Sequence, residues 1–178
     1  MSAAISVTRS QLLAALRGFL LSAVDVEVVQ AQDNRVAMPD GPFITMTDMG
    51  FIGLSTNRSS YHDPGAGIGT ETNARSTQWN VQLDFYGEGA ADLAATVAVL
   101  VRSEYACRQL ANSGMQPLYA GEPRNTTLLN GEQQYEERWT LEFSAQCNPS
   151  VTTPMDFADE LVIQLAETDV TFPPEIDA

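Results

Sequence analysis

The clearest pattern in the chain lies between residues 78 and 105, where apolar residues change from a strand spacing to a helix spacing. Within 79–85 every second residue is apolar, which predicts a strand with one buried face. Gly87 and Gly89 interrupt that strand. A helix with one apolar stripe is predicted to follow, and the stripe consists of Leu93, Val97, Leu100, Val101 and Tyr105. We expect this strand and helix to pack on each other at the centre of the core.

Similar patterns predict one more helix and several more strands. Thr8 followed by Gln11 matches a capping box, so a helix is predicted to begin there and to end near Ser22 or Ala23. Its apolar face consists of Leu12, Leu13, Leu16, Phe19 and Leu20. Alternating apolar positions predict strands at 24–28, 43–54, 115–119, 135–145 and 160–172. The strand at 43–54 has apolar residues on both faces, which indicates that both faces are covered.

The predicted order of elements is α-β-β-β-α-β-β-β. This order is typical of an α+β fold, with a mixed, largely antiparallel sheet and two main helices packed on one face. A length of 178 residues fits one domain over 1–178. Residues 56–73 are predicted to form a long loop, which is either an ordered contact with a neighbouring subunit or a mobile surface loop. Residues 173–178 are predicted to form a loose C-terminal tail.

The charge of the chain is strongly negative. The formal net charge is −14, and every basic residue except one histidine is an arginine. Such a chain does not bind nucleic acid by neutralising phosphates. It can surround DNA without gripping it, or its acidity can simply keep the surface soluble. The longest apolar run, 94–101, is too short to cross a membrane, and the N-terminus does not match a signal peptide. We therefore expect a soluble product of a cytoplasm without a membrane partner.

Candidate catalytic and cofactor motifs are weak. The GAGIG run at 65–69 lacks the Lys of a phosphate-binding loop, and no strand leads directly into it. His62 is the only histidine, so it cannot supply a His-rich metal site. A catalytic triad would need this same histidine, and the chain has no GxSxG elbow to present a serine. Cys107 and Cys147 lack CxxC spacing and are predicted to be buried free thiols. No cofactor, metal site or catalytic residue is predicted.

Several blocks of sequence resemble a family of tailed-phage proteins, the neck or tail terminator (tail-completion) proteins. The resemblance covers roughly residues 24–172. The blocks that carry it are RVAMPDGPF at 35–43, VQLDFYG at 81–87 with AAD at 90–92, SEYAC at 103–107, QPLY at 116–119 and NGEQQYEERW at 130–139.

This resemblance implies a virion structural protein of the neck, made in the host cytoplasm. It implies a ring, usually of six copies, that caps the tail tube and joins the tail to the head connector, with DNA passing through the lumen. The partners implied are further copies of the chain, the tail tube protein, and head connector or adaptor proteins. The alternatives are a head-completion adaptor, a tail tube subunit, or a small hydrolase that uses His62.

Contacts between subunits, or with partner rings, are expected at the loop 56–73 and the turn at 38–43. Arginines in an acidic chain are candidates for such contacts, because a guanidinium group pairs well with carboxylates. Pairing within one subunit is the alternative explanation. The predicted interface residues are Arg35, Met38, Asp40, Arg58, Tyr61, His62, Arg75 and Arg124.

Overall fold

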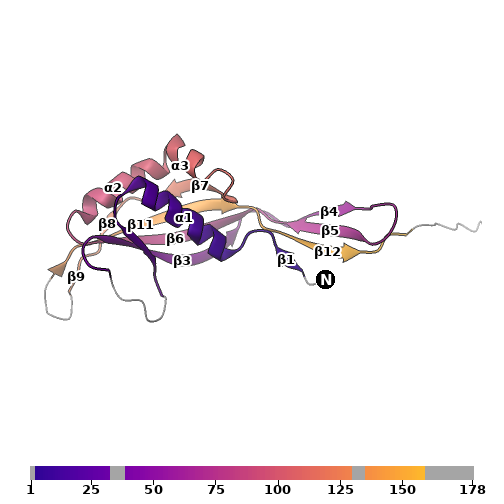
Figure 1. Cartoon of the computed structure of the whole chain (residues 1–178), viewed down its shortest axis with the longest axis horizontal. Coiled ribbons are helices and arrows are strands. Elements are labelled where there is room, and N and C mark those ends of the chain that lie inside the picture. The colour runs from indigo at the N-terminus through magenta and orange to yellow at the C-terminus, as the bar shows by residue number, and fades with distance from the viewer. Residues whose placement is uncertain (1–2, 33–38, 130–134, 159–178) are drawn as a thin grey trace, which may run out of the picture.

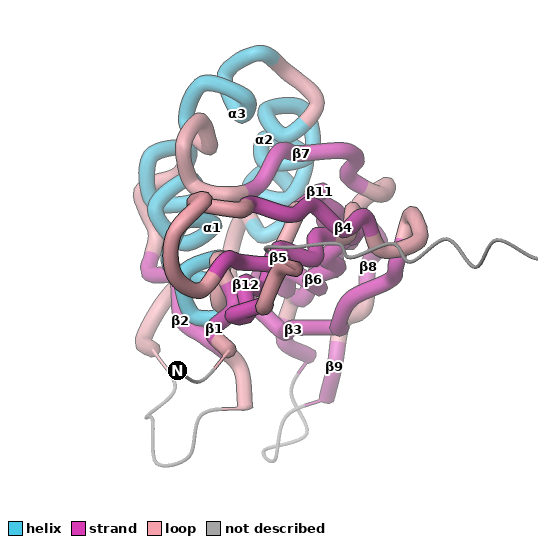
Figure 2. The backbone as a smooth tube through the Cα atoms, turned by 90° about the vertical axis from the view of Figure 1, so that its right-hand side faces the viewer, coloured by secondary structure: helices cyan, strands magenta, loops and turns pink. Residues whose placement is uncertain are grey.

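The computed structural model describes residues 3–32, 39–129 and 135–158. In these residues the chain forms a body, in which helices cover one face of a sheet, and an arm, a second sheet that extends from one end of the body (Figure 1). A view turned by 90° also shows the helices on one side of the body sheet (Figure 2). The predicted α+β class, with a largely antiparallel sheet and helices on one face, is confirmed.

The body sheet has the strand order β2-β3-β6-β11-β7, and the short strand β8 also pairs with β11. Strands β2 and β3 are parallel, whereas the other pairs in this sheet are antiparallel. The register places Leu83 of β6 opposite Leu141 of β11, so the apolar faces of the two central strands coincide. The bounds are β2 Glu27–Gln30, β3 Phe43–Gly53, β6 Thr77–Tyr86, β7 Met115–Ala120, β8 Arg124–Asn125 and β11 Arg138–Cys147.

Within the described residues, three helices lie over this sheet: α1 Arg9–Ala23, α2 Ala90–Val101 and α3 Glu104–Gln109. The predicted capping box is confirmed, because the Thr8 hydroxyl accepts a hydrogen bond from the Gln11 N–H at 3.3 Å and the Gln11 side chain accepts one from the Thr8 N–H at 2.9 Å. The prediction that the second helix continues through Tyr105 is wrong. That helix ends at Val101, and Ser103 caps a new one by accepting the Tyr105 N–H at 3.2 Å.

The arm extends three strands of the body. Strands β4, β5 and β12 continue β3, β6 and β11 in the same pairing order, and β1 pairs with the far side of β12. The bounds are β1 Ala4–Ile5, β4 Arg58–His62, β5 Gly69–Ala74 and β12 Ser150–Met155. At the junction, the Leu54 N–H donates to the Ser76 carbonyl at 2.9 Å and the Arg75 N–H donates to the Pro149 carbonyl at 3.2 Å. The three strands therefore remain hydrogen-bonded as they pass from the body into the arm.

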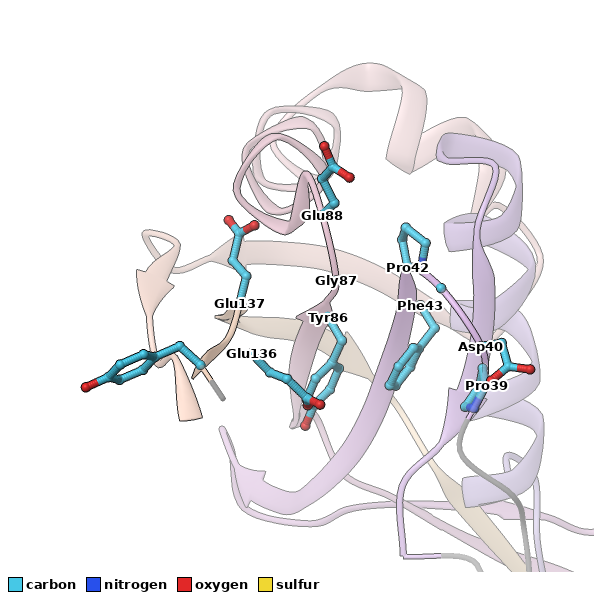
Figure 3. Close-up of a pocket in the computed structure, with 11 residues that line it drawn as sticks. Pro39, Asp40, Pro42, Phe43, Tyr86, Gly87, Glu88, Glu136 and Glu137 are labelled. Carbon is cyan, nitrogen blue, oxygen red and sulfur yellow. The ribbon is translucent and has the colours of Figure 1, made fainter. Parts of the chain in front are cut away.

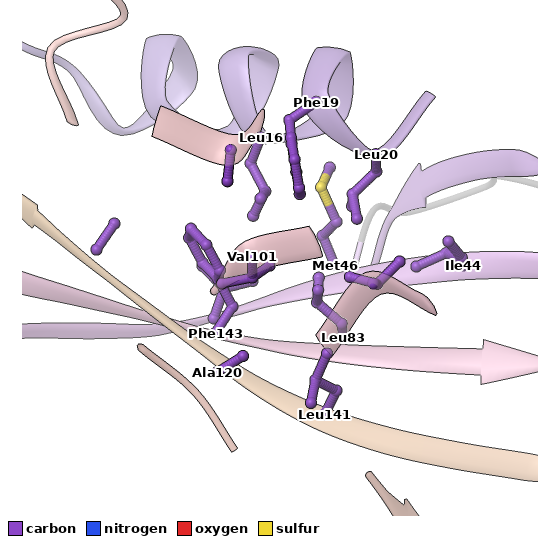
Figure 4. Packing of buried hydrophobic residues seen from close by; sticks show 14 of the residues in the cluster. Leu16, Phe19, Leu20, Ile44, Met46, Leu83, Val101, Ala120, Leu141 and Phe143 are labelled. Atoms are coloured by element: carbon purple, nitrogen blue, oxygen red, sulfur yellow. The ribbon is translucent and has the colours of Figure 1, made fainter. Parts of the chain in front are cut away.

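The hydrophobic core lies between the helices and the body sheet (Figure 4). Leu16, Phe19 and Leu20 of α1 point toward the sheet, and all three are almost fully buried. Met46 and Leu83 meet them from strands β3 and β6. Burying such a side chain contributes about 1.5–3 kcal/mol relative to leaving it exposed. This core confirms the apolar face predicted for the first helix and the central place predicted for the strand and helix at 78–105.

The prediction of a long loop over 56–73 is corrected by the structure. Strands β4 and β5 form an antiparallel hairpin there, with Arg58 opposite Ala74 and His62 opposite Thr70. The sequence gives little sign of this hairpin because its strands are mostly polar and exposed, so they lack the alternation that marks a half-buried strand. Strand β12, which supports the hairpin through β5, lies far along the chain.

Other expectations are also corrected or lie outside the described residues. The strand at 43–54 is buried through Met46, but its second half is largely exposed rather than covered on both faces. Cys147 is buried as predicted, whereas Cys107 is exposed. A small hairpin pairs β9 Leu128–Leu129 with β10 Tyr135–Glu136. The predicted strand at 160–172 and the predicted tail at 173–178 lie outside the described residues.

Candidate assembly interface

The arm carries three of the predicted contact residues in exposed positions. All five residues of β4 are exposed, including Arg58, Tyr61 and His62. Strand β4 is the edge of the arm sheet, and its described partner is β5 alone. No described helix covers either face of this sheet (Figure 1). Three of the predicted interface residues therefore lie together on one exposed edge.

Arg75 lies at the junction between the body and the arm. Its Nε donates a hydrogen bond to the Ser55 carbonyl at 2.9 Å, and the neighbouring Ser76 N–H donates to the Ser55 hydroxyl at 3.2 Å. These contacts join the strand that enters the arm to the strand that leaves it. In the isolated subunit, Arg75 thus holds the base of the arm.

A second candidate surface lies at the end of the body opposite the arm, where β3 begins and β6 ends. The turn that precedes β3 and the segments after β6 and before β11 enclose an open cleft of about 660 Å³ (Figure 3). Its lining is rich in carboxylates, which are contributed by Asp40, Glu88, Glu136 and Glu137. This end of the subunit is therefore suited to a cationic group or a basic segment.

The wall of this cleft is built from stacked rings and an ion pair. The rings of Phe43 and Tyr86 are stacked, with centroids 4.6 Å apart and planes at 9°. The guanidinium carbon of Arg138 lies 5.5 Å from the centroid of the Tyr86 ring, and the same guanidinium pairs with Asp84 at 3.0 Å. Burial raises the pKa of Tyr86 above its ordinary value. These contacts join side chains of β3, β6 and β11 along the wall of the cleft.

The structure does not bring the predicted interface residues into one site. Asp40 lines the cleft, the three β4 residues lie on the arm, and Arg75 lies at the junction between the two. Arg124 is exposed on β8, which pairs with the outer part of β11. Arg35 and Met38 lie outside the described residues. The predicted interface residues that the structure describes therefore lie on separate parts of the subunit surface.

The acidic cleft was not predicted as a site. Glu88 follows β6, whereas Glu136 and Glu137 lie about fifty positions further along the chain, and only the pairing of β6 with β11 brings them together. The register that causes this places Tyr86 opposite Arg138. The spacing of these residues in the sequence does not predict that they lie close together. The pair Glu136 and Glu137 just before a strand could have indicated an exposed acidic surface.

His62 and its neighbour Asp63, the candidates for catalysis or metal binding, lie at the turn of the arm hairpin. His62 is exposed at the end of β4, and the carboxylate of Asp63 accepts a hydrogen bond from the Gly65 N–H at 2.8 Å, which stabilises the turn of the hairpin. Across the described ranges, no group of three or more His, Cys, Asp and Glu residues is placed to hold a metal ion. No helix in the same ranges combines the length and the apolar character needed to cross a membrane.

The fold defines the class of the protein: an α+β protein in which a sheet arm and open strand edges are exposed. The family model of the phage neck terminator protein matches residues 10–172, so the chain belongs to that family. It is a structural tail terminator of a bacteriophage and a component of the virion, not an enzyme. The predicted resemblance is confirmed, and the hydrolase alternative is rejected.

One similar solved structure is the sheath/tube terminator of an extracellular contractile injection system, PVC, determined by cryo-EM in its extended state. The TM-score is 0.58 with 13% sequence identity, and the match covers 94% of this chain and 65% of that chain. This chain thus spans less than two thirds of that protein's length, and the likeness concerns the fold. A comparison with curated proteins found no match.

Proposed function

We propose that copies of this protein assemble into a six-membered ring that caps the tail tube at the neck of the virion and joins the tail to the head connector. DNA passes through the lumen of the ring without sequence-specific binding. Synthesis takes place in the host cytoplasm, and the ring becomes part of the head–tail junction. Membership of the neck terminator family supports the capping role.

The observation that carries the ring is the exposed arm. An isolated sheet of a few strands with neither face covered is only marginally stable in water, and an open edge invites pairing with another chain. Strand β4 is exposed along its whole length at that edge. A neighbouring copy that receives the arm would cover both the edge and a face of the sheet, which would stabilise the arm and link the copies.

The geometry of the subunit favours a head-to-tail interface, in which unlike surfaces of successive copies meet. The exposed arm and the acidic cleft lie at opposite ends of the elongated subunit (Figure 1). Contacts between unlike surfaces generate a ring when the rotation between copies closes, and a filament when it does not. A terminator must stop polymerisation, so we infer a closing rotation.

The charge of the subunit supports passage of DNA through the ring. A net charge of −14 per copy gives the assembly a strongly negative field. Phosphates are repelled by such a field, so DNA can slide through the lumen without sticking. We expect carboxylates to outnumber basic groups on the surface that faces the lumen.

Deleting residues 58–72, which removes β4 and most of β5, tests the role of the arm. The body has its own core, so the variant should unfold cooperatively as a monomer, while ring formation and tail attachment are lost. Native mass spectrometry reports the stoichiometry, and complementation of a phage that lacks the gene reports tail attachment. Val99→Ser, an exposed change on α2 away from the arm, is the matched control and should leave both unchanged. A deletion variant that still gives six-membered rings and intact virions would contradict the proposal.

Immunogold labelling of virions tests the location. Label confined to the head–tail junction supports the neck position, whereas label along the whole tail identifies a tube subunit instead. Two antibodies are used, one against a peptide of the arm and one against a peptide of the body. Label on disrupted particles alone would mean that the epitope is covered in the intact virion. Absence of both labels from disrupted particles would overturn the structural role.

A further inference from the structure

The outer edge of β3 carries an unusual strip of exposed apolar residues. Strand β2 pairs with β3 only from Phe43 to Met46, and no other described strand pairs with this edge from Thr47 to Gly53. Large apolar side chains are exposed in and just after this open stretch, and we call them the apolar edge strip: Met49 at 61%, Phe51 at 48%, Ile52 at 55% and Leu54 at 48%. Exposed apolar side chains grouped on an open strand edge mark an interaction site.

The strip is also free of charge. Residues 49–57 contain no acidic or basic side chain. The carboxylate of Asp48, just before the strip, is already bound by Arg9 of α1 and by the Trp79 indole. The guanidinium group of the exposed Arg75 lies against Gly53, and its Nε already donates a hydrogen bond to the Ser55 carbonyl at 2.9 Å. A partner that covers the strip therefore meets one cation, which is already hydrogen-bonded within its own subunit.

The opposite edge of the body sheet has matching properties. Strand β7 ends the sheet on that side, and its Leu118 and Tyr119 are 48% and 52% exposed. Residues 109–121, which include all of β7, also contain no charged side chain. Pro117 lies within β7 and has no N–H to donate, so this edge suits packing of side chains better than addition of a continuous strand.

We propose that the apolar edge strip of one copy packs against the β7 edge of the next copy, around Leu118. This inference rests on the proposed ring and names its body contact. Copies with a net charge of −14 repel each other, so the contact between them is favoured where apolar side chains are exposed and carboxylates are few. The charged groups beside the two edges are already held within their own subunit, because Arg75 donates to the Ser55 carbonyl and Arg102 pairs with Glu122. The two edges lie on opposite sides of one sheet, so their pairing joins unlike surfaces and is head-to-tail.

Cysteine cross-linking tests this contact directly. Ile52→Cys and Leu118→Cys are introduced singly and together into a Cys107→Ser background, because Cys107 is exposed whereas Cys147 is buried. A short bis-maleimide is used, since a direct disulfide demands stricter geometry. Assemblies formed by the purified chain and those recovered from virions are both treated. The double variant should give a covalent ladder that ends at the closed ring, and a mixture of the two single variants should give a dimer.

The controls separate the outcomes. Each single variant alone should give no cross-link, and Ile52→Cys combined with Val99→Cys, an exposed position on α2, should give none either. A dimer from Ile52→Cys alone would show that like edges meet, and would overturn the head-to-tail contact. Rings that form without any cross-link between positions 52 and 118 would overturn this inference while leaving the proposed ring intact. Absence of any assembly, in solution and in virions, would overturn both.

Discussion

The carboxylate of Asp48 accepts a hydrogen bond from the indole Nε1–H of the fully buried Trp79 at 2.9 Å. The same side chain pairs with Arg9 of α1 and accepts the Gly50 N–H at 2.9 Å. Asp48 lies where the register of β3 against β6 shifts, and the Phe51 ring then stacks on Trp79 with centroids 6.3 Å apart. One carboxylate therefore ties α1 and β6 to the irregular part of β3, just before the apolar edge strip.

We expect Asp48→Ala to lower the free energy of unfolding by about 1–3 kcal/mol at neutral pH. The substitution leaves the buried Trp79 N–H without its acceptor, and an unpaired buried donor costs about that much. Urea denaturation measures the change, and Asp25→Ala, at an exposed position before β2, serves as a comparison. Equal stability of the wild type and Asp48→Ala would contradict the assigned role.

The effect of Asp48 should also depend on pH. Burial by itself would raise the pKa of Asp48, but hydrogen bonds from Arg9, the Gly50 N–H and Trp79 outweigh it, so the pKa lies below the ordinary value of 3.8. A carboxyl group whose pKa is lower in the folded state stabilises the fold above its unfolded-state pKa and loses that contribution as the pH falls through its folded-state pKa. The stability difference between wild type and Asp48→Ala should therefore shrink below about pH 4. A difference that stays constant down to pH 2 would show that charge plays no part.

Arg138→Met should destabilise the fold much more than Arg124→Met. Arg138 pairs at 3.0 Å with Asp84, whose side chain is 3% exposed and also accepts the Thr140 hydroxyl at 2.6 Å. Removing the arginine leaves a buried carboxylate without its countercharge, which should cost about 3–5 kcal/mol. Arg124 is exposed, and its replacement should change stability by less than about 0.5 kcal/mol. Guanidinium denaturation would contradict this prediction if the two variants had the same midpoint.

Thr8→Ala should lower the thermal midpoint by about 2–4 °C, because an N-cap threonine contributes about 1 kcal/mol to a helix. The loss removes the acceptor of the Gln11 N–H and one side of the capping box. Ser10→Ala, an exposed change within the same first turn, is the control and should leave the midpoint unchanged or slightly higher, since alanine favours helix. Differential scanning calorimetry provides both values. Equal midpoints for the two variants would mean that the cap is unimportant.

Association between copies should strengthen as salt is raised. Raising the ionic strength from about 0.01 M to about 0.1 M shortens the Debye length from about 30 Å to about 10 Å, which screens repulsion between the acidic copies. An apolar contact between uncharged edges is not weakened by this screening. Sedimentation velocity at several salt concentrations should therefore show more of the assembled form at higher salt. Association that weakens with salt would indicate an interface held by ion pairs, such as one between Arg58 of β4 and the acidic cleft.

The pattern of apolar residues predicted the helices and strands that bury one face in the core. The capping box at Thr8 and the apolar stripe that follows it define α1, and the alternation at 79–85 defines β6. The strand at 115–119 is β7, and that at 135–145 is largely β11. The break between α2 and α3 was missed because the apolar spacing continues across it, whereas the hydroxyl of Ser103 decides where the backbone turns.

The arm and the two candidate contact surfaces were decided only by the tertiary structure. Strand β12 contains Pro154 and follows Pro149, so local chemistry argues against a strand, yet Thr152 pairs with Thr72 of β5. The acidic cleft and the open edge of β3 likewise depend on pairings between distant parts of the chain. From the sequence alone came α1, the beginning of α2, the central strands, the acidity and the family. The sequence could not determine the arm or the edges, because exposed strands are held by backbone hydrogen bonds that leave no pattern of side chains.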